Sequence, residues 1–358
     1  MIGEIKPDEV TKEIEEVIEA KIEVNVVSDD DTKEILKQLL SEKESEIDEN
    51  LKHIITPYTK KKDILHFIAD YKTLEEEAKQ INNNIYRRIR LKRIMLDSKF
   101  DDLIINPFVE VSHDDREIAS KFLPNHKLSG LETLVKIIAN GKLSSSKALG
   151  ILPLEERVKR GQEDSIFISA GAPYSHLKIM RESGDMNFNR HNLPLIVFTN
   201  DLYERSSFKA TPRDSFSYDD EMEIREYTLS HEDLETYIKQ MVADNKVLAE
   251  QKQFRIRSDR MSEYGTFFPE ITIDGEISLN EMKMIILTRD DKAALLKNLF
   301  ESNNFRNLIG KKVKSITELE NILTEKFGFK LVIPDDELSV DQMYWRIIGF
   351  DIPEYAEI

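Results

Sequence analysis

One glutamate, Glu270, stands where a carboxylate could do chemistry, at the start of a β-type segment. Apolar and polar residues alternate after it as far as the turn pair Asp274-Gly275, and a short apolar run then ends at Leu287. This pattern predicts a strand, a turn and a returning strand. Pro269 lacks an N–H and suits the first position or an edge of a strand, so we expect Glu270 near the rim of a sheet. A carboxylate fixed there could stabilise a developing positive charge, although these residues alone favour an ordinary surface glutamate in a hairpin.

The chain around Glu270 predicts a mixture of helices and strands, which begins near Asn106-Pro107. Helices are expected over Leu131–Asn140, His231–Phe254, Lys292–Phe300 and Thr317–Phe327, and strands over Ile166–Ile168, Leu193–Thr199, Phe329–Ile333 and, as a further candidate, Glu221–Thr228. The predicted fold class is α+β. A helical N-terminal region, residues 1–105, is followed by a mixed-sheet domain, residues 106–358, with a helical C-terminal extension.

The first hundred residues have helical spacing. Asp8–Ile22 carries apolar residues on one face, a second helix is expected near Ile35–Leu40, and a longer helical stretch runs from Ile64 to Ile94. The basic run Arg87–Arg93 could contact an acidic partner or phosphates. It lacks interleaved aromatic residues, and a charge run on a helix is usually a solvated face.

Charge and composition limit the function classes. The 358 residues include 68 acidic and 51 basic ones, a formal net charge of −17, so a polyanion would need a local basic patch to bind. Cysteine is absent, which excludes disulfides, thiolate nucleophiles and cysteine metal sites. No apolar run has the length of a signal peptide or a membrane span, so we expect a soluble protein without a membrane span.

Several common catalytic signatures are absent from the sequence, namely Gly-x-x-x-x-Gly-Lys, Gly-x-Gly-x-x-Gly, His-Glu-x-x-His and Gly-x-Ser-x-Gly. Acidic clusters at Asp29–Asp31 and Asp219–Glu221 lack the ligand spacing of a calcium loop. We interpret these clusters as solvated or helix-capping residues, and we expect no metal site.

Three short motifs follow one another along the mixed domain. The first is His126 with Lys127-Leu128-Ser129 and the Leu-rich helix that ends in Asn-Gly-Lys-Leu; the second is Ser165–Ser169 with Tyr174; the third is Glu270 within Pro-Glu-Ile-x-Ile-x-Gly-x-Ile-x-Leu. Together they resemble the ADP-ribosyltransferase superfamily in its His/Tyr/Glu branch, and the flanks of Glu270 are similar to those of DNA-modifying toxin members. The resemblance covers about residues 120–290 and rests on the order and spacing of the motifs.

The resemblance implies an ADP-ribosyltransferase-like domain with NAD as its substrate. Breaking the bond between nicotinamide and ribose develops an oxocarbenium-like cation, and Glu270 would be the catalytic carboxylate that stabilises it. His126 would hold the adenosine-side ribose or the pyrophosphate, Tyr174 would clamp the planar nicotinamide, and Ser169 would also contact NAD. The alternatives are a loop histidine at His126 and a packing residue at Tyr174, and His176 is a rival contact.

Two features depart from the family pattern. Phe268 stands two residues before Glu270, where transferases that modify arginine in proteins usually carry an acid, so arginine is a less favoured acceptor. Glu221-Met-Glu223 supplies a Glu-x-Glu pair similar to that of the Arg/Ser/Glu branch, and on a strand both carboxylates would face one side. In that rival alignment Glu223 would be the catalytic acid. We prefer Glu270 because the residues after it match better.

The resemblance therefore implies an NAD-dependent ADP-ribosyltransferase of unknown acceptor, with a protein favoured over nucleic acid. Abundant Lys, Glu, Asn and Ile are typical of low-GC microbial or viral proteins, and superfamily members from such sources often act as toxins or effectors. We expect the protein in the cytoplasm, or secreted into a host or competitor cell by a signal that is not visible. The alternative is a non-enzymatic acidic helical adaptor that binds a protein partner through its first hundred residues.

Overall fold

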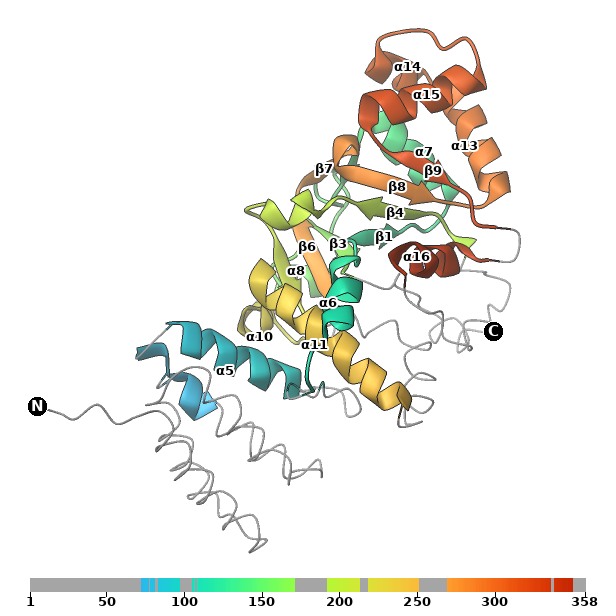
Figure 1. Cartoon of the computed structure of the whole chain (residues 1–358). Coiled ribbons are helices and arrows are strands. Elements are labelled where there is room, and N and C mark those ends of the chain that lie inside the picture. The colour runs from blue at the N-terminus through green and yellow to red at the C-terminus, as the bar shows by residue number, and fades with distance from the viewer. Residues whose placement is uncertain are drawn as a thin grey trace, which may run out of the picture. The chain divides into compact units, whose positions relative to one another are not determined.

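The structure is a computed structural model that describes residues 72–76, 78–80, 83–96, 105, 107, 109–170, 192–212, 218–250, 269–335 and 338–349 (Figure 1). The chain divides into two compact units, Met1–Glu110 and Val111–Ile358. The boundary expected between residues 105 and 106 stays a prediction. Among the described residues, every helix is too short or too polar to cross a membrane.

The described part of the first unit is largely helical. Residues 72–76 and 78–80 are helical, and α5 spans Asn83–Leu96. The basic run on α5 is not a wholly solvated face, because the side chain of Arg93 is 1 % exposed and its Nε donates to Glu75 Oε1 at 2.7 Å. The helices expected at Asp8–Ile22 and near Ile35–Leu40 lie outside the described residues.

The second unit is α+β, as the sequence predicts. Its strands are β1 Asn125–Lys127, β2 Lys142–Ser144, β3 Ser165–Ser169, β4 Leu195–Phe198, β5 Lys209–Thr211, β6 Glu270–Asp274, β7 Glu276–Ser278, β8 Met282–Ile286 and β9 Lys330–Val332. Its helices are α6 His113–Ser120, α7 Leu131–Asn140, α8 Glu155–Lys159, α10 Glu221–Tyr227, α11 His231–Glu250, α13 Arg289–Glu301, α14 Asn303–Ile309, α15 Ile316–Phe327 and α16 Val340–Ile348, with 3-10 turns η2 Asn200–Glu204 and η4 Leu279–Glu281.

Seven strands form one sheet in the order β5-β6-β3-β1-β4-β8-β9 (Figure 1). Every neighbouring pair is antiparallel except β8 and β9, which are parallel. Strands β2 and β7 form a separate two-stranded ribbon. The seven-stranded sheet is weakly joined at its centre, because β1 and β3 share only the registered pair Asn125↔Ser169.

Isoleucines of paired strands stack on one face of the sheet. Ile168 faces Ile271 across the β3–β6 ladder, and Ile196 faces Ile285 across the β4–β8 ladder. All four side chains are at most 1 % exposed. Burying one such side chain contributes roughly 1.5–3 kcal/mol, so these pairs fix the register that positions the neighbouring polar residues.

The hairpin expected around Glu270 is wrong, although both of its strands exist. Strand β6 pairs with β3 and β5, whereas β8 pairs with β4 and β9. The reason is Gly275, whose φ of 86° turns the chain out of β6 and into β7. Strand β7 then pairs with β2, and the chain enters β8 only after the turn η4.

The strand expected over Glu221–Thr228 is also wrong, because this segment forms helix α10. Asp220 caps the helix by accepting a hydrogen bond from the Glu223 amide, which confirms the capping interpretation of this acidic cluster. The buried residues Ile224 and Tyr227 are three apart, a helical spacing. The two carboxylates of the Glu-x-Glu pair therefore do not share a strand face.

Candidate functional site

The site begins with His126 on β1, the strand at the centre of the sheet. Its Nδ1 lies 2.6 Å from the carbonyl oxygen of Phe167 on β3. A carbonyl oxygen can only accept, so Nδ1 carries the proton and donates. In the neutral ring, Nε2 is then the nitrogen that can accept a hydrogen bond from another group.

Burial favours the neutral form of this histidine. Desolvation lowers the pKa of His126 from its ordinary value of 6.5, and the hydrogen bond to Phe167 opposes that shift only in part. A neutral imidazole with a fixed tautomer is suited to binding an uncharged hydroxyl group rather than to providing a positive charge.

The His126 side chain also replaces backbone pairing at the weak centre of the sheet. Asn125 pairs with Ser169, but no further registered pair joins β1 to β3. The imidazole spans the two strands one residue beyond that pair and reaches the Phe167 carbonyl. The relative position of β1 and β3 therefore depends on this side chain, and not on a full ladder.

Four polar residues lie in one register row across neighbouring strands. Thr211 of β5 pairs with Glu270 of β6, Glu270 pairs with Ser169 of β3, and Ser169 pairs with Asn125 of β1. Directly paired residues project from the same face, with neighbouring Cβ atoms about 4.5–5.5 Å apart. We call these four residues the polar row. Asn125 and Thr211 are buried, whereas Ser169 and Glu270 are half-buried.

Glu270 occupies the first position of β6, directly after Pro269, as the sequence predicts. The strand lies between β3 and β5, so Glu270 is at the end of an interior strand and not on an edge strand. The Ala170 amide donates to the Pro269 carbonyl at 2.9 Å, which continues the β3–β6 pairing past Glu270. Main-chain pairing with β3 therefore continues on both sides of Glu270.

The structure brings two of the four sequence-predicted site residues into direct contact, because Ser169 and Glu270 are paired. His126 lies on the strand next to β3 but in the following row, where it pairs with Ile196. Successive residues of a strand project from opposite faces, so the His126 side chain leaves β1 on the face opposite to the polar row. The remaining predicted residue, Tyr174, and its rival His176 lie outside the described residues, as does Phe268.

The rival acid, Glu223, is occupied elsewhere. It lies in the first turn of α10, where its Oε2 accepts a hydrogen bond from the Asp219 amide at 2.6 Å. Its own amide donates to Asp220 Oδ1 at 2.9 Å. These two hydrogen bonds tie Glu223 to the start of α10, and Glu223 has no position in the polar row.

Sequence reasoning missed Asn125 and Thr211, although both complete the polar row. Asn125 directly precedes His126 and could have been suspected from that position. Thr211 lies on a three-residue strand that the sequence did not predict. Its place beside Glu270 follows from strand order and register, which no local pattern reports.

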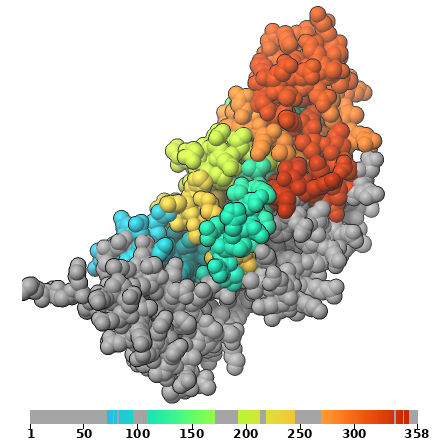
Figure 2. Space-filling model, viewed as in Figure 1, coloured from blue at the N-terminus to red at the C-terminus, as the bar shows by residue number. Residues whose placement is uncertain are grey.

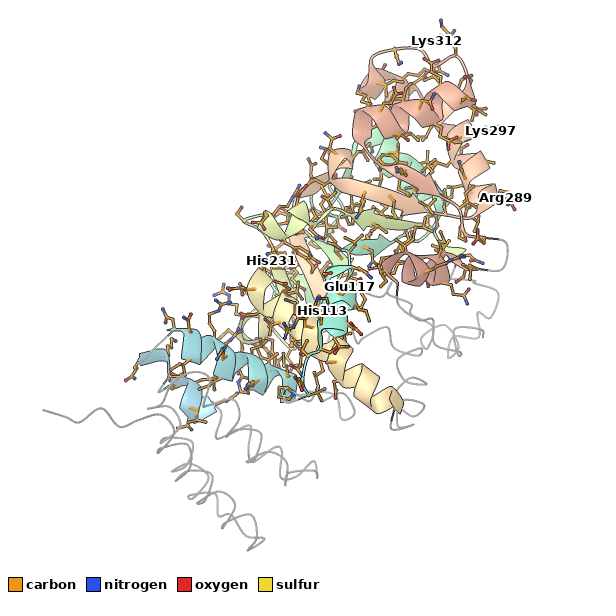
Figure 3. The ribbon with its side chains drawn as sticks, in the orientation of Figure 1. His113, Glu117, His231, Arg289, Lys297 and Lys312 are labelled. Carbon is orange, nitrogen blue, oxygen red and sulfur yellow. The ribbon has the colours of Figure 1, made fainter. Side chains whose placement is uncertain are left out.

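Three exposed cations lie away from the polar row. Arg289 and Lys297 lie on α13, and Lys312 follows α14; Figure 3 shows all three toward the end of the second unit that α13, α14 and α15 form. Lys209, which flanks Thr211 on β5, lies 3.7 Å from Asp274 as an ion pair. Arg157 lies closer to the row, with its guanidinium carbon 4.2 Å from the centre of the Phe167 ring on β3.

In the described part of the chain, no group of three or more acidic or histidine side chains is arranged to hold a metal ion. Comparison of the chain with protein-family models, with curated proteins and with solved structures gives no match.

Proposed function

We propose that this protein is an NAD-dependent ADP-ribosyltransferase with Glu270 as its catalytic carboxylate. The observation that supports this most is that three separate motifs lie on neighbouring strands, with Ser169 and Glu270 directly paired. His126, Ser169 and Glu270 are far apart in the sequence, yet they lie on β1, β3 and β6, which are adjacent in the sheet. If the short motifs matched the family only by chance, they would not be expected to lie on adjacent strands.

The proposed role of Glu270 is electrostatic. The bond between ribose C1′ and the nicotinamide nitrogen breaks, and its electron pair leaves with nicotinamide, so positive charge develops on the ribose. A half-buried carboxylate at a fixed position stabilises that charge. The acceptor nucleophile then forms the new bond to C1′ and releases its proton; water in that role would give hydrolysis.

His126 and Ser169 would bind NAD before the reaction. The neutral imidazole donates from Nδ1 to Phe167, which leaves Nε2 to accept a hydrogen bond from a ribose hydroxyl. The Ser169 hydroxyl projects on the same face as Glu270 and would contact the substrate beside it. Tyr174 stays a prediction for the nicotinamide stack.

The acceptor class follows from charge more than from geometry. The net charge of −17 repels nucleic acid, and Arg289, Lys297 and Lys312 lie away from Glu270. We therefore propose a protein acceptor. A toxin or effector role is a further proposal that rests on the resemblance alone.

The test is nicotinamide release from NAD by wild type and by Glu270→Gln. Glutamine keeps the shape and one accepting oxygen but removes the charge, so we expect the rate to fall by roughly 10² to 10³, or about 3 to 4 kcal/mol. Binding of NAD, measured by thermal shift, should change far less, because the ribose carries no full positive charge before the bond begins to break.

Glu223→Gln is the matched control, and its rate should stay close to wild type because Glu223 caps α10. A loss confined to Glu223→Gln would overturn the assignment of Glu270. If wild type shows neither NAD binding nor nicotinamide release, the acidic helical adaptor becomes the better hypothesis.

A further inference from the structure

Helix α16 is hydrogen-bonded to the segment just before β1. The Tyr344 hydroxyl donates to the Leu123 carbonyl at 2.9 Å and accepts from the Leu123 amide at 3.3 Å. The ring is fully buried. Burial raises the pKa of Tyr344, so the hydroxyl keeps its proton and can donate.

The same tyrosine reaches the polar row. A hydrogen bond with the Asn125 side chain acts on the Tyr344 phenol, and the Asn125 amide donates to the Leu123 carbonyl at 3.1 Å. Asn125 is completely buried and forms the single registered pair that joins β1 to β3. Tyr344, Leu123 and Asn125 therefore form one buried hydrogen-bonded group at the weak centre of the sheet.

A second contact fastens α16 to the other end of β1. The Lys127 ammonium forms an ion pair with the Asp341 carboxylate, and the side chains are 7 % and 9 % exposed. Breaking a buried pair from one side leaves an uncompensated charge and is strongly unfavourable. Asp341 and Tyr344 are three residues apart and so lie on one face of the helix.

The start of α16 makes a further hydrogen bond, in which the Val340 amide donates to Asn192 Oδ1 at 3.3 Å. Gly349, which follows the helix, lies close to the Lys121 side chain at the end of α6. In Figure 2 the red C-terminal residues accordingly lie beside the teal residues of α6. The contacts of α16 with Leu123 and Lys127 thus enclose the segment that carries Asn125 and His126.

We propose that α16 is a clamp on β1, in which Asp341 and Tyr344 are positioning residues that set the place of His126 against Phe167. The inference about NAD chemistry rests on the proposed function, whereas the clamp itself does not. Because β1 has only one registered pair with β3, the contacts of α16 add to the restraints on β1 that its ladder with β4 supplies. The helix lies outside the region that resembles ADP-ribosyltransferases.

The test is histidine NMR of the full chain, with the His126 signal identified by its loss in His126→Gln. Tyr344→Phe removes only the hydroxyl, and Asp341→Asn removes only the charge. We expect both to shift the His126 ring signals and to raise the exchange rate of its Nδ1 proton by roughly tenfold, the effect of one typical buried hydrogen bond. Ser315→Ala, which removes the N-cap of α15, should destabilise the protein without moving these signals.

If Asp341→Asn fails to fold, Tyr344→Phe alone tests the clamp, because the phenylalanine ring still fills the space of the tyrosine ring. Unchanged His126 signals in folded Tyr344→Phe would overturn the clamp. A separate measurement with NAD tests the function: the KM for NAD should rise several-fold in both variants and stay constant in Ser315→Ala. Shifted His126 signals in a protein that neither binds nor cleaves NAD would support the clamp and reject the proposed function.

Discussion

Burial of His126 makes the free energy of unfolding depend on pH. The pKa of His126 is lowered from 6.5 in the folded protein, so the folded state binds a proton less readily than the unfolded chain does. Above the unfolded pKa both states are neutral and the group contributes nothing to pH dependence. As the pH falls below that value, only the unfolded chain gains the proton, and the free energy of unfolding decreases.

We therefore expect this group to remove up to about 1.4 kcal/mol of stability per pH unit as the pH falls from about 6.5 toward the folded pKa. The measurement is denaturant unfolding of wild type and His126→Gln at a series of pH values. Their difference in free energy of unfolding isolates the histidine from the many carboxylates. If that difference is constant with pH, the pKa of His126 is the same in the folded and unfolded states and the prediction is wrong.

Residue identity alone could predict part of the site. Glu270 was expected at the first position of a strand because Pro269 precedes it, and this is confirmed. The row that joins it to Thr211 and Asn125 could not be expected, since it depends on the register of three ladders. The β3–β6 register is supported by the buried pair Ile168↔Ile271, and a slip of one residue would place these polar side chains on the other face.

Elements with strong local signals were predicted well. Helix α7 spans Leu131–Asn140, as expected, because Gly141 adopts a φ of 80° that ends it in the left-handed region. Helix α10 was misread because its charged residues mask the spacing of Ile224 and Tyr227. The predicted strand pairing around Gly275 is wrong for a different reason. Tertiary packing determines which strands pair, and the sequence of a short segment does not report it.

Two glycines that end helices should differ in their tolerance to alanine. Gly141 and Gly328 both adopt left-handed conformations, with φ of 80° and 82°, which costs an L-residue roughly 1–2 kcal/mol. A Cβ on Gly141 would meet Leu308 Cδ1 at 2.9 Å, whereas a Cβ on Gly328 would meet nothing within 4 Å. We expect thermal unfolding to show a larger loss for Gly141→Ala. The extra loss should be modest, because the Leu308 methyl can move, and an equal loss in both variants would mean that it moves freely.

At the scale of the whole molecule, the residues of the candidate site belong to one compact unit. His126, Ser169 and Glu270 all lie within Val111–Ile358, and so does α16. The first helix of this unit, α6, carries its own capping box, in which Ser112 accepts from the Asp115 amide and Asp115 accepts from the Ser112 amide. The unit therefore has a defined helical start without the residues before Val111.

A fragment that begins at Val111 should fold on its own and keep any nicotinamide release. Its first helix retains the capping box and packs against α11. A fragment that begins at His113 loses Ser112, and we expect it to be less stable by about 0.5–2 kcal/mol, the usual cost of losing an N-cap. Chemical unfolding of the two fragments measures this difference, and nicotinamide release measures the site. An aggregated Val111–Ile358 fragment would mean that residues 1–110 complete its core, and a folded fragment that has lost an activity present in the full chain would place part of the site in the first unit.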